Sequence, residues 1–119
     1  MTIAGLLPEK ANAELKTWLQ TKAEGQDPKM ALALMRDLFD LDTGNLLNEA
    51  KVPVRCINSA GGYKSFIPTA VETNKKYADY GAVTIEGVGH YPMLEKPDEF
   101  NRKLRAVLKE FATKKEGRP

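Results

Sequence analysis

Apolar positions recur at helical spacing in the first fifty residues. They predict a helix over 8–24, with Pro8 in its first turn, where the missing N–H is not needed. A second helix is predicted over 28–39, with Asp27 as its cap. A turn and a short helical piece over 43–50 follow. The second helix carries an apolar stripe of Met30, Ala31, Leu34, Met35 and Leu38.

The pattern changes at residue 51. Short apolar runs predict strands over 53–58 and 82–87, separated by a loop and by a helix from Pro68 to about Tyr80. A final helix begins at Pro97, and its periodicity is the clearest in the chain. Its apolar side consists of Phe100, Leu104, Val107, Leu108 and Phe111.

This order of elements predicts a layered α/β fold with two short parallel strands and flanking helices, because strands separated by a helix pair in parallel. So small a parallel sheet needs cover on both faces and neighbours at its edges. The first two helices, another chain or the remainder of a larger protein must supply that cover. We therefore expect a homo-oligomer, in the simplest case a dimer, and exchange of helices between the copies is one way to form it.

Composition narrows the functional classes. The chain has 119 residues, 42% hydrophobic and 29% charged, which is typical of one globular domain or part of a larger one. A formal net charge of +2 is too small to indicate nucleic-acid or membrane binding. The single cysteine, the absence of a signal-like N-terminus and the lack of a long apolar run predict a cytoplasmic protein. One histidine and one distant cysteine predict no metal site, and we expect no cofactor.

The strongest local signal is the stretch "GVGHYPMLEKPDEF" at residues 87–100, which contains the only histidine, His90. Together with "KVPVRCINS" upstream, this stretch resembles the C-terminal third of an α/β-hydrolase. In that family a strand leads to the loop of the triad acid, and a helix, a last strand, a G-x-G-H loop and a closing helix follow. The resemblance implies a partial α/β-hydrolase-like fold over 51–113 and a helical cap-like segment over 1–50. The charged end of the chain, with Lys114, Lys115 and Arg118, predicts a flexible tail over 114–119.

The resemblance implies that His90 is a general base, which deprotonates a serine, aspartate or cysteine nucleophile or activates water. Gly87 and Gly89 would let the backbone turn sharply, so that the imidazole projects from the end of the strand into a cleft. The implied reaction is hydrolysis of an ester, amide or related bond in a small organic substrate. An apolar substrate pocket would be lined by Leu34, Met35, Leu38, Tyr91 and Met93.

Other parts of the family pattern are missing from the sequence. There is no G-x-S-x-G elbow, nor its Asp or Cys variant. The loop "SAGGYKSF" contains no carboxylate, so Asp42, which precedes the first strand, is the candidate triad acid; Asp40 precedes that strand as well. We interpret Glu86 and Glu95 as solvated surface residues. Ser59 and Ser65 are interpreted as loop serines, and Cys56 as a small core residue.

Three functional hypotheses follow. The first is an incomplete hydrolase that needs a complementary N-terminal half to supply the nucleophile. The second is a non-catalytic α/β module that associates with itself through its sheet edges and apolar helices. The third is a stand-alone hydrolase. The sequence leaves open whether the chain is an enzyme.

Overall fold

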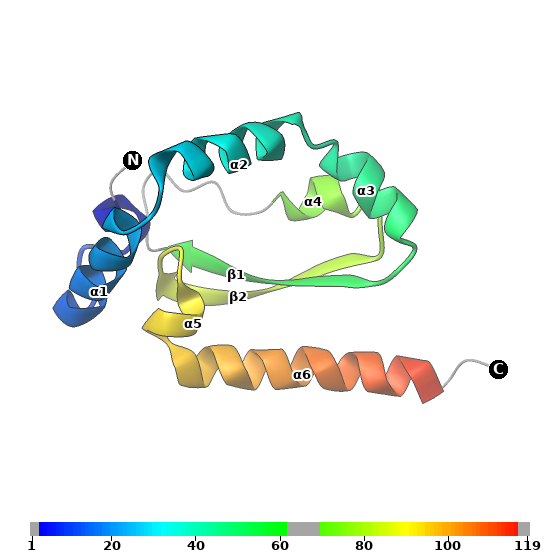
Figure 1. Cartoon of the computed structure of the whole chain (residues 1–119). Coiled ribbons are helices and arrows are strands. Elements are labelled where there is room, and N and C mark those ends of the chain that lie inside the picture. The colour runs from blue at the N-terminus through cyan, green and yellow to red at the C-terminus, as the bar shows by residue number, and fades with distance from the viewer. Residues whose placement is uncertain (1–2, 62–69, 117–119) are drawn as a thin grey trace.

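The computed structural model describes residues 3–61 and 70–116. It combines helices with a two-stranded parallel sheet, and so confirms the α/β class (Figure 1). The elements in chain order are η1 (Ile3–Leu6), α1 (Ala13–Glu24), α2 (Pro28–Asp40), α3 (Thr43–Ala50), β1 (Val54–Gly61), α4 (Val71–Asn74), β2 (Tyr80–Val88), α5 (Pro92–Glu95) and α6 (Pro97–Glu116).

The two strands pair in parallel, as predicted, with Val54 opposite Tyr80 and Ala60 opposite Glu86. The register slips by one residue beyond Ala60, so that Gly61 lies opposite Val88. Both strands are longer than predicted. Residues 59–61 were expected in a loop, but they continue β1, because β2 extends far enough to pair with them. The rest of the predicted loop lies outside the described residues.

The helix predicted from Pro68 to about Tyr80 is wrong. Residues 68 and 69 lie outside the described part of the chain, and α4 spans only Val71–Asn74 before a turn leads into β2. Tyr80 belongs to the sheet, and the N–H of Val54 donates to the carbonyl of Asp79 at 2.8 Å. Pairing with β1 therefore takes up Tyr80, and a turn over 75–79 separates it from α4.

The N-terminal helix begins at Ala13, five residues later than Pro8. Its cap is Asn12, whose Oδ1 accepts from the N–H groups of Glu14 at 2.8 Å and Leu15 at 3.1 Å. The second helix agrees with its prediction to within a residue, and Asp27 caps it by accepting from the N–H of Lys29 at 2.9 Å.

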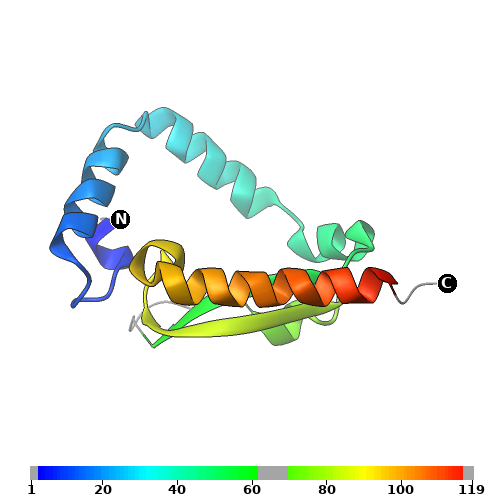
Figure 2. The ribbon, with the colours of Figure 1, turned by 90° about the horizontal axis from the view of Figure 1, so that it is seen from below.

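Helix α6 lies along the sheet and contacts both strands (Figures 1 and 2). In the described part of the chain, the buried apolar core is small and consists of Leu7, Leu19, Ile85, Val88 and Val107. Only part of the apolar side predicted for α6 is covered: Val107 is buried, whereas Leu108 is 56% exposed. Helix α2 has no buried residue and stands away from the sheet and from α6 in both views. The first two helices therefore do not cover the sheet together.

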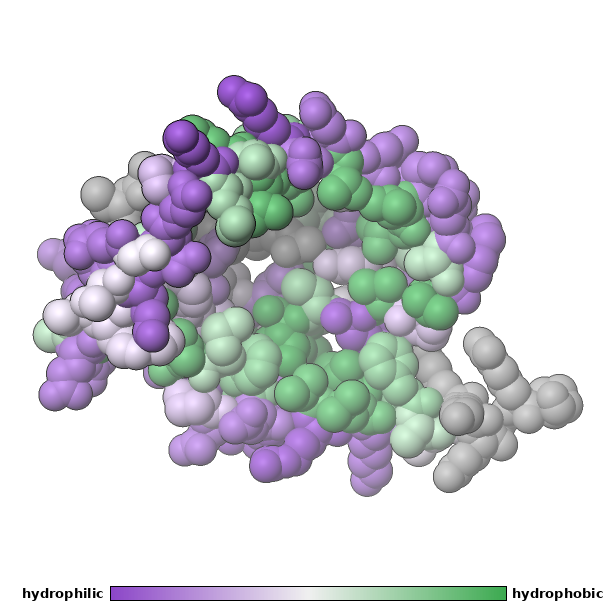
Figure 3. Space-filling view, viewed as in Figure 1, coloured by the Kyte–Doolittle hydropathy of each residue, from purple (hydrophilic) through white to green (hydrophobic). Residues whose placement is uncertain are grey.

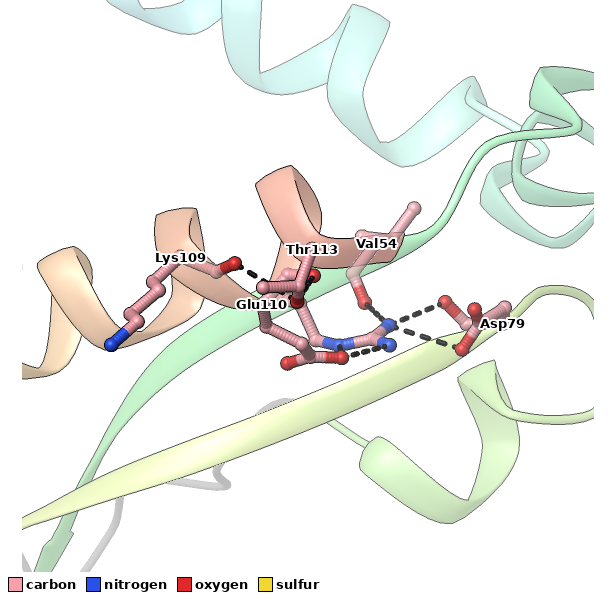
Figure 4. Close-up of polar contacts among 6 residues, drawn as sticks. Val54, Asp79, Lys109, Glu110 and Thr113 are labelled. Atoms are coloured by element: carbon pink, nitrogen blue, oxygen red, sulfur yellow. Dashed lines mark hydrogen bonds and ion pairs between the residues drawn. The ribbon is translucent and has the colours of Figure 1, made fainter. Parts of the chain in front are cut away.

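A charged cluster joins the starts of both strands to the far end of α6 (Figure 4). The guanidinium of Arg55 donates from Nη2 to Oε1 of Glu110 at 2.9 Å, and its Nη1 lies 3.1 Å from Oδ1 of Asp79. The same Nη1 donates to the backbone carbonyls of Val54 and Asp79, both at 2.9 Å. The hydrogen bond to Glu110 is the main reason why the pKa of Arg55 is raised above its usual value. This cluster therefore links the start of the sheet to α6.

Candidate functional site

The loop that carries His90 leaves β2 at its carboxyl end, at a position where the backbone requires glycine. Gly87 has a φ of 67°, in the left-handed region that side chains rarely adopt. Gly89 is buried against the N-terminal segment, where an added Cβ would lie 2.8 Å from Cδ of Pro8 and 3.0 Å from Cα of Leu7. Gly87 therefore has the turning role that the sequence predicted for both glycines, whereas Gly89 is needed for close packing against the N-terminal segment.

Two sets of hydrogen bonds fix the backbone of this loop. The N–H of His90 donates to the carbonyl of Leu6 at 2.7 Å, which ties the loop to η1. The carboxylate of Glu95 accepts from the N–H of Gly89 at 2.9 and 3.0 Å and from the N–H of Tyr91 at 3.2 Å. The interpretation of Glu95 as a solvated surface residue is therefore wrong, because its side chain closes the loop from the end of α5.

Sequence reasoning missed Glu95 because its partners are backbone groups four and six residues earlier, which come within reach only after Pro92–Glu95 turns into a short helix. The sequence signal that could have indicated this role of Glu95 is a carboxylate shortly after a glycine-containing loop and just before a new helix. Glu86, by contrast, is exposed, as expected for a solvated side chain.

The imidazole of His90 is exposed at the carboxyl end of the parallel strands, and the ring of Tyr91 lies edge-on to it, with ring centroids 5.4 Å apart. In parallel α/β sheets, ligands bind in the crevice beyond the carboxyl ends of the strands. A histidine on a fixed loop at this end can accept a proton from any acidic group that comes within hydrogen-bond distance of its ring.

The structure does not bring Asp42 to His90. Asp42 caps α3, and its Oδ1 accepts from the N–H of Asn45 at 3.0 Å. Helix α3 leads into the start of β1, whereas His90 follows the end of β2. The strands are parallel, and the eight residues of β1 span roughly 26 Å. Figure 1 shows α3 at the opposite end of the sheet from α5. Asp42 is therefore a helix cap in this arrangement.

The five residues predicted to line a substrate pocket fall into two groups. Leu34, Met35 and Leu38 lie on α2 and are 63%, 48% and 57% exposed. Tyr91 and Met93 lie in and just after the histidine loop, where Tyr91 is half-buried and Met93 is exposed. An open cavity of about 460 Å³ lies between the start of α1, the end of β2 and α5, and none of the five lines it. Its walls include Pro8, Asn12, Leu15, Val88, Leu94 and Lys96.

The alternative nucleophiles lie within β1 or outside the described residues. Ser59 is buried inside β1 opposite Ile85, and Ser65 lies outside the described residues. Cys56 lies in the middle of β1, where its Sγ donates to Oδ1 of Asn58 at 2.7 Å. Burial is the main cause of the raised pKa of Tyr80, and a hydrogen bond to Cys56 adds to it. This part of the sheet is therefore a half-buried polar cluster within the fold.

Within residues 3–61 and 70–116, no group of three or more His, Cys, Asp or Glu residues could hold a metal ion. The helices of the same part of the chain include none with the length and apolar character needed to cross a membrane. Comparisons with protein-family models, with curated proteins and with solved structures find no match for this chain.

Proposed function

We propose that this chain is the histidine-bearing part of an α/β-hydrolase-type structure, and that His90 is its general base for hydrolysis of an ester, amide or related bond in a small organic substrate. The observation that supports the proposal is the position of the histidine. It extends from a loop fixed by Glu95 and by Leu6 at the carboxyl end of a parallel sheet, while its imidazole is exposed. Positioning of this kind is what a catalytic base requires.

In the proposed reaction, the neutral imidazole takes the proton of a nucleophile as that nucleophile attacks the substrate carbonyl, and later returns the proton to the leaving group. The nucleophile and the oxyanion donors would come from a complementary polypeptide, because the sequence contains no nucleophile elbow. The chain by itself is therefore expected to be inactive.

The test is reconstitution. The DNA directly upstream of the codon for Met1 is sequenced, and any frame that encodes a G-x-S-x-G elbow, or its Asp or Cys variant, is co-expressed with this chain. Hydrolysis of a p-nitrophenyl ester is then measured for the wild type, for His90→Gln and for Lys109→Gln, an exposed control on α6. We expect activity in the wild type and the control, and its loss in His90→Gln. Equal rates in all three complexes would refute a role for His90 as the base.

The isolated chain provides the matching experiment. We expect its ester hydrolysis to stay at the buffer rate in both the wild type and His90→Gln. A rate that depends on His90 in the isolated chain would contradict the need for a complementary half and would support a stand-alone hydrolase.

A second candidate function is a non-catalytic module that associates with itself. One observation favours it: α2 exposes its whole apolar stripe and buries no residue. If the upstream DNA encodes no elbow, this second candidate takes the lead.

A further inference from the structure

The largest uncovered apolar surface lies around an opening in the molecule. Figure 3 shows hydrophobic residues gathered on both sides of this opening, over α2 and α3 on one side and over the sheet and α6 on the other. We call this surface the open apolar face. The exposed large apolar side chains of these helices include Met30, Leu34, Met35, Leu38 and Leu41 in and after α2, Leu46 on α3, and Leu104 and Leu108 on α6.

Helix α2 buries no residue against the rest of the chain, so it gains little stability from packing in this position. It has 13 residues, and helices of this length are marginal in water unless tertiary packing buries an apolar face. Its stripe recurs at helical spacing, and Arg36 lies on the opposite side of the helix. The stripe is therefore built to pack against another apolar surface.

The missing cover can be estimated from the area that the whole chain exposes. A compact folded chain of 13.2 kDa exposes about 6,400 Å². This chain exposes 9203 Å², which is about 2,800 Å² more. Its radius of gyration is 16.7 Å, against about 13.5 Å for a compact domain of this length. The excess per chain is far above the roughly 800 Å² per partner of a standard-size stable interface, and over two chains it amounts to about 5,600 Å², the size of large obligate homodimer interfaces.

We infer that two copies of this chain form an obligate homodimer in which α2 of each copy packs into the opening between α2 and α6 of the other. An isologous arrangement uses the same apolar surface twice, so it covers the stripe of α2 and the exposed side of α6 in both copies. A formal net charge of +2 gives only weak repulsion between the copies. The inference concerns the isolated chain and does not rest on the proposed catalytic role of His90.

Light scattering coupled to size-exclusion chromatography tests the stoichiometry. At about 2–50 µM protein, we expect about twice the chain mass of 13.2 kDa. Leu34→Glu places a charge in the stripe and should raise the dimer dissociation constant at least tenfold. Ala33→Glu introduces the same residue at the adjacent position, outside the stripe, and should leave the dimer intact. A monomer mass for the wild type, a mass above the dimer, or equal masses for both variants would overturn the inference.

Hydrogen–deuterium exchange of the wild type gives a second test that does not depend on how Leu34→Glu folds. The amides of Pro28–Asp40 should become more protected as the protein concentration rises from below to above the dissociation constant. Protection of α2 that does not change while the dimer forms would place the interface elsewhere and refute the proposed surface.

Discussion

Replacing Gly89 with alanine should loosen the histidine loop from the N-terminal segment. The new methyl group would lie 2.8 Å from Cδ of Pro8, 3.0 Å from Cα of Leu7, and in collision with the carbonyl oxygen of Leu6. Two of these neighbours are backbone atoms, which cannot move aside as a flexible side chain would. The segment around η1 must therefore shift away from the loop.

The cost of this shift follows from what the shift breaks. The hydrogen bond from the N–H of His90 to Leu6, 2.7 Å long, contributes about 1 kcal/mol. Leu7 is only 2% exposed, and partial loss of its burial costs about 1–3 kcal/mol. We therefore expect Gly89→Ala to lower the free energy of unfolding by about 2–4 kcal/mol.

Two other glycines provide controls in the same experiment. Gly87 has a positive φ but no close neighbour, so Gly87→Ala should cost about 1–2 kcal/mol from backbone strain alone. Gly25 has a φ of −79°, and a Cβ there would be in ordinary van der Waals contact, 3.7 Å from the carbonyl oxygens of Thr21 and Lys22, so Gly25→Ala should be neutral or stabilising by about 0.5 kcal/mol. The assay is urea denaturation followed by far-ultraviolet circular dichroism, at one protein concentration for all variants. Gly89→Ala as stable as the wild type, or less costly than Gly87→Ala, would refute the packing argument.

Two further predictions concern the sheet. Arg55→Met removes the ion pairs with Asp79 and Glu110 but keeps an apolar side chain of similar length. Because both carboxylates are partly exposed and can be rehydrated, we expect the free energy of unfolding, measured by urea denaturation, to fall by about 1–3 kcal/mol. Lys75→Met removes an exposed ion pair with Glu72 and should lower the free energy of unfolding by at most about 0.5 kcal/mol. Equal losses for the Arg55 and Lys75 variants would contradict the stabilising role of the charged cluster around Arg55. Burial raises the pKa of Tyr80, so its contribution to stability is complete below the unfolded value of about 10 and is lost as the pH rises through the higher folded pKa. Tyr80→Phe should therefore reduce the loss of stability that the wild type shows as the pH rises above about 10, measured by the same assay. A pH profile equal to that of the wild type would refute the assignment.

The sequence predicted the elements whose determinants are local. Helix α2 begins where Asp27 and Pro28 favour a start, and the structure begins it there. The two apolar runs became strands, and the intervening helical segment required parallel pairing between them. The sequence predicted a sharp turn at the glycines before His90, and the positive φ of Gly87 agrees with that role. The close approach of the N-terminal segment to Gly89 was not predicted from the sequence. The α/β-hydrolase relationship and the catalytic role of His90 remain predictions.

Where local preferences compete with contacts to distant residues, only the tertiary structure decided the conformation of the chain. Residues 59–61 and Tyr80 joined the sheet because each found a partner across it. The first long helix begins after its cap Asn12 and does not include Pro8, which lies instead against Gly89. Glu95 stabilises the histidine loop by accepting from the N–H groups of Gly89 and Tyr91, which come within reach of its carboxylate only after the chain folds back. The exposed stripe of α2 likewise depends on how the helices are placed, because periodicity in the sequence shows that a helix has an apolar side, and packing decides what covers that side.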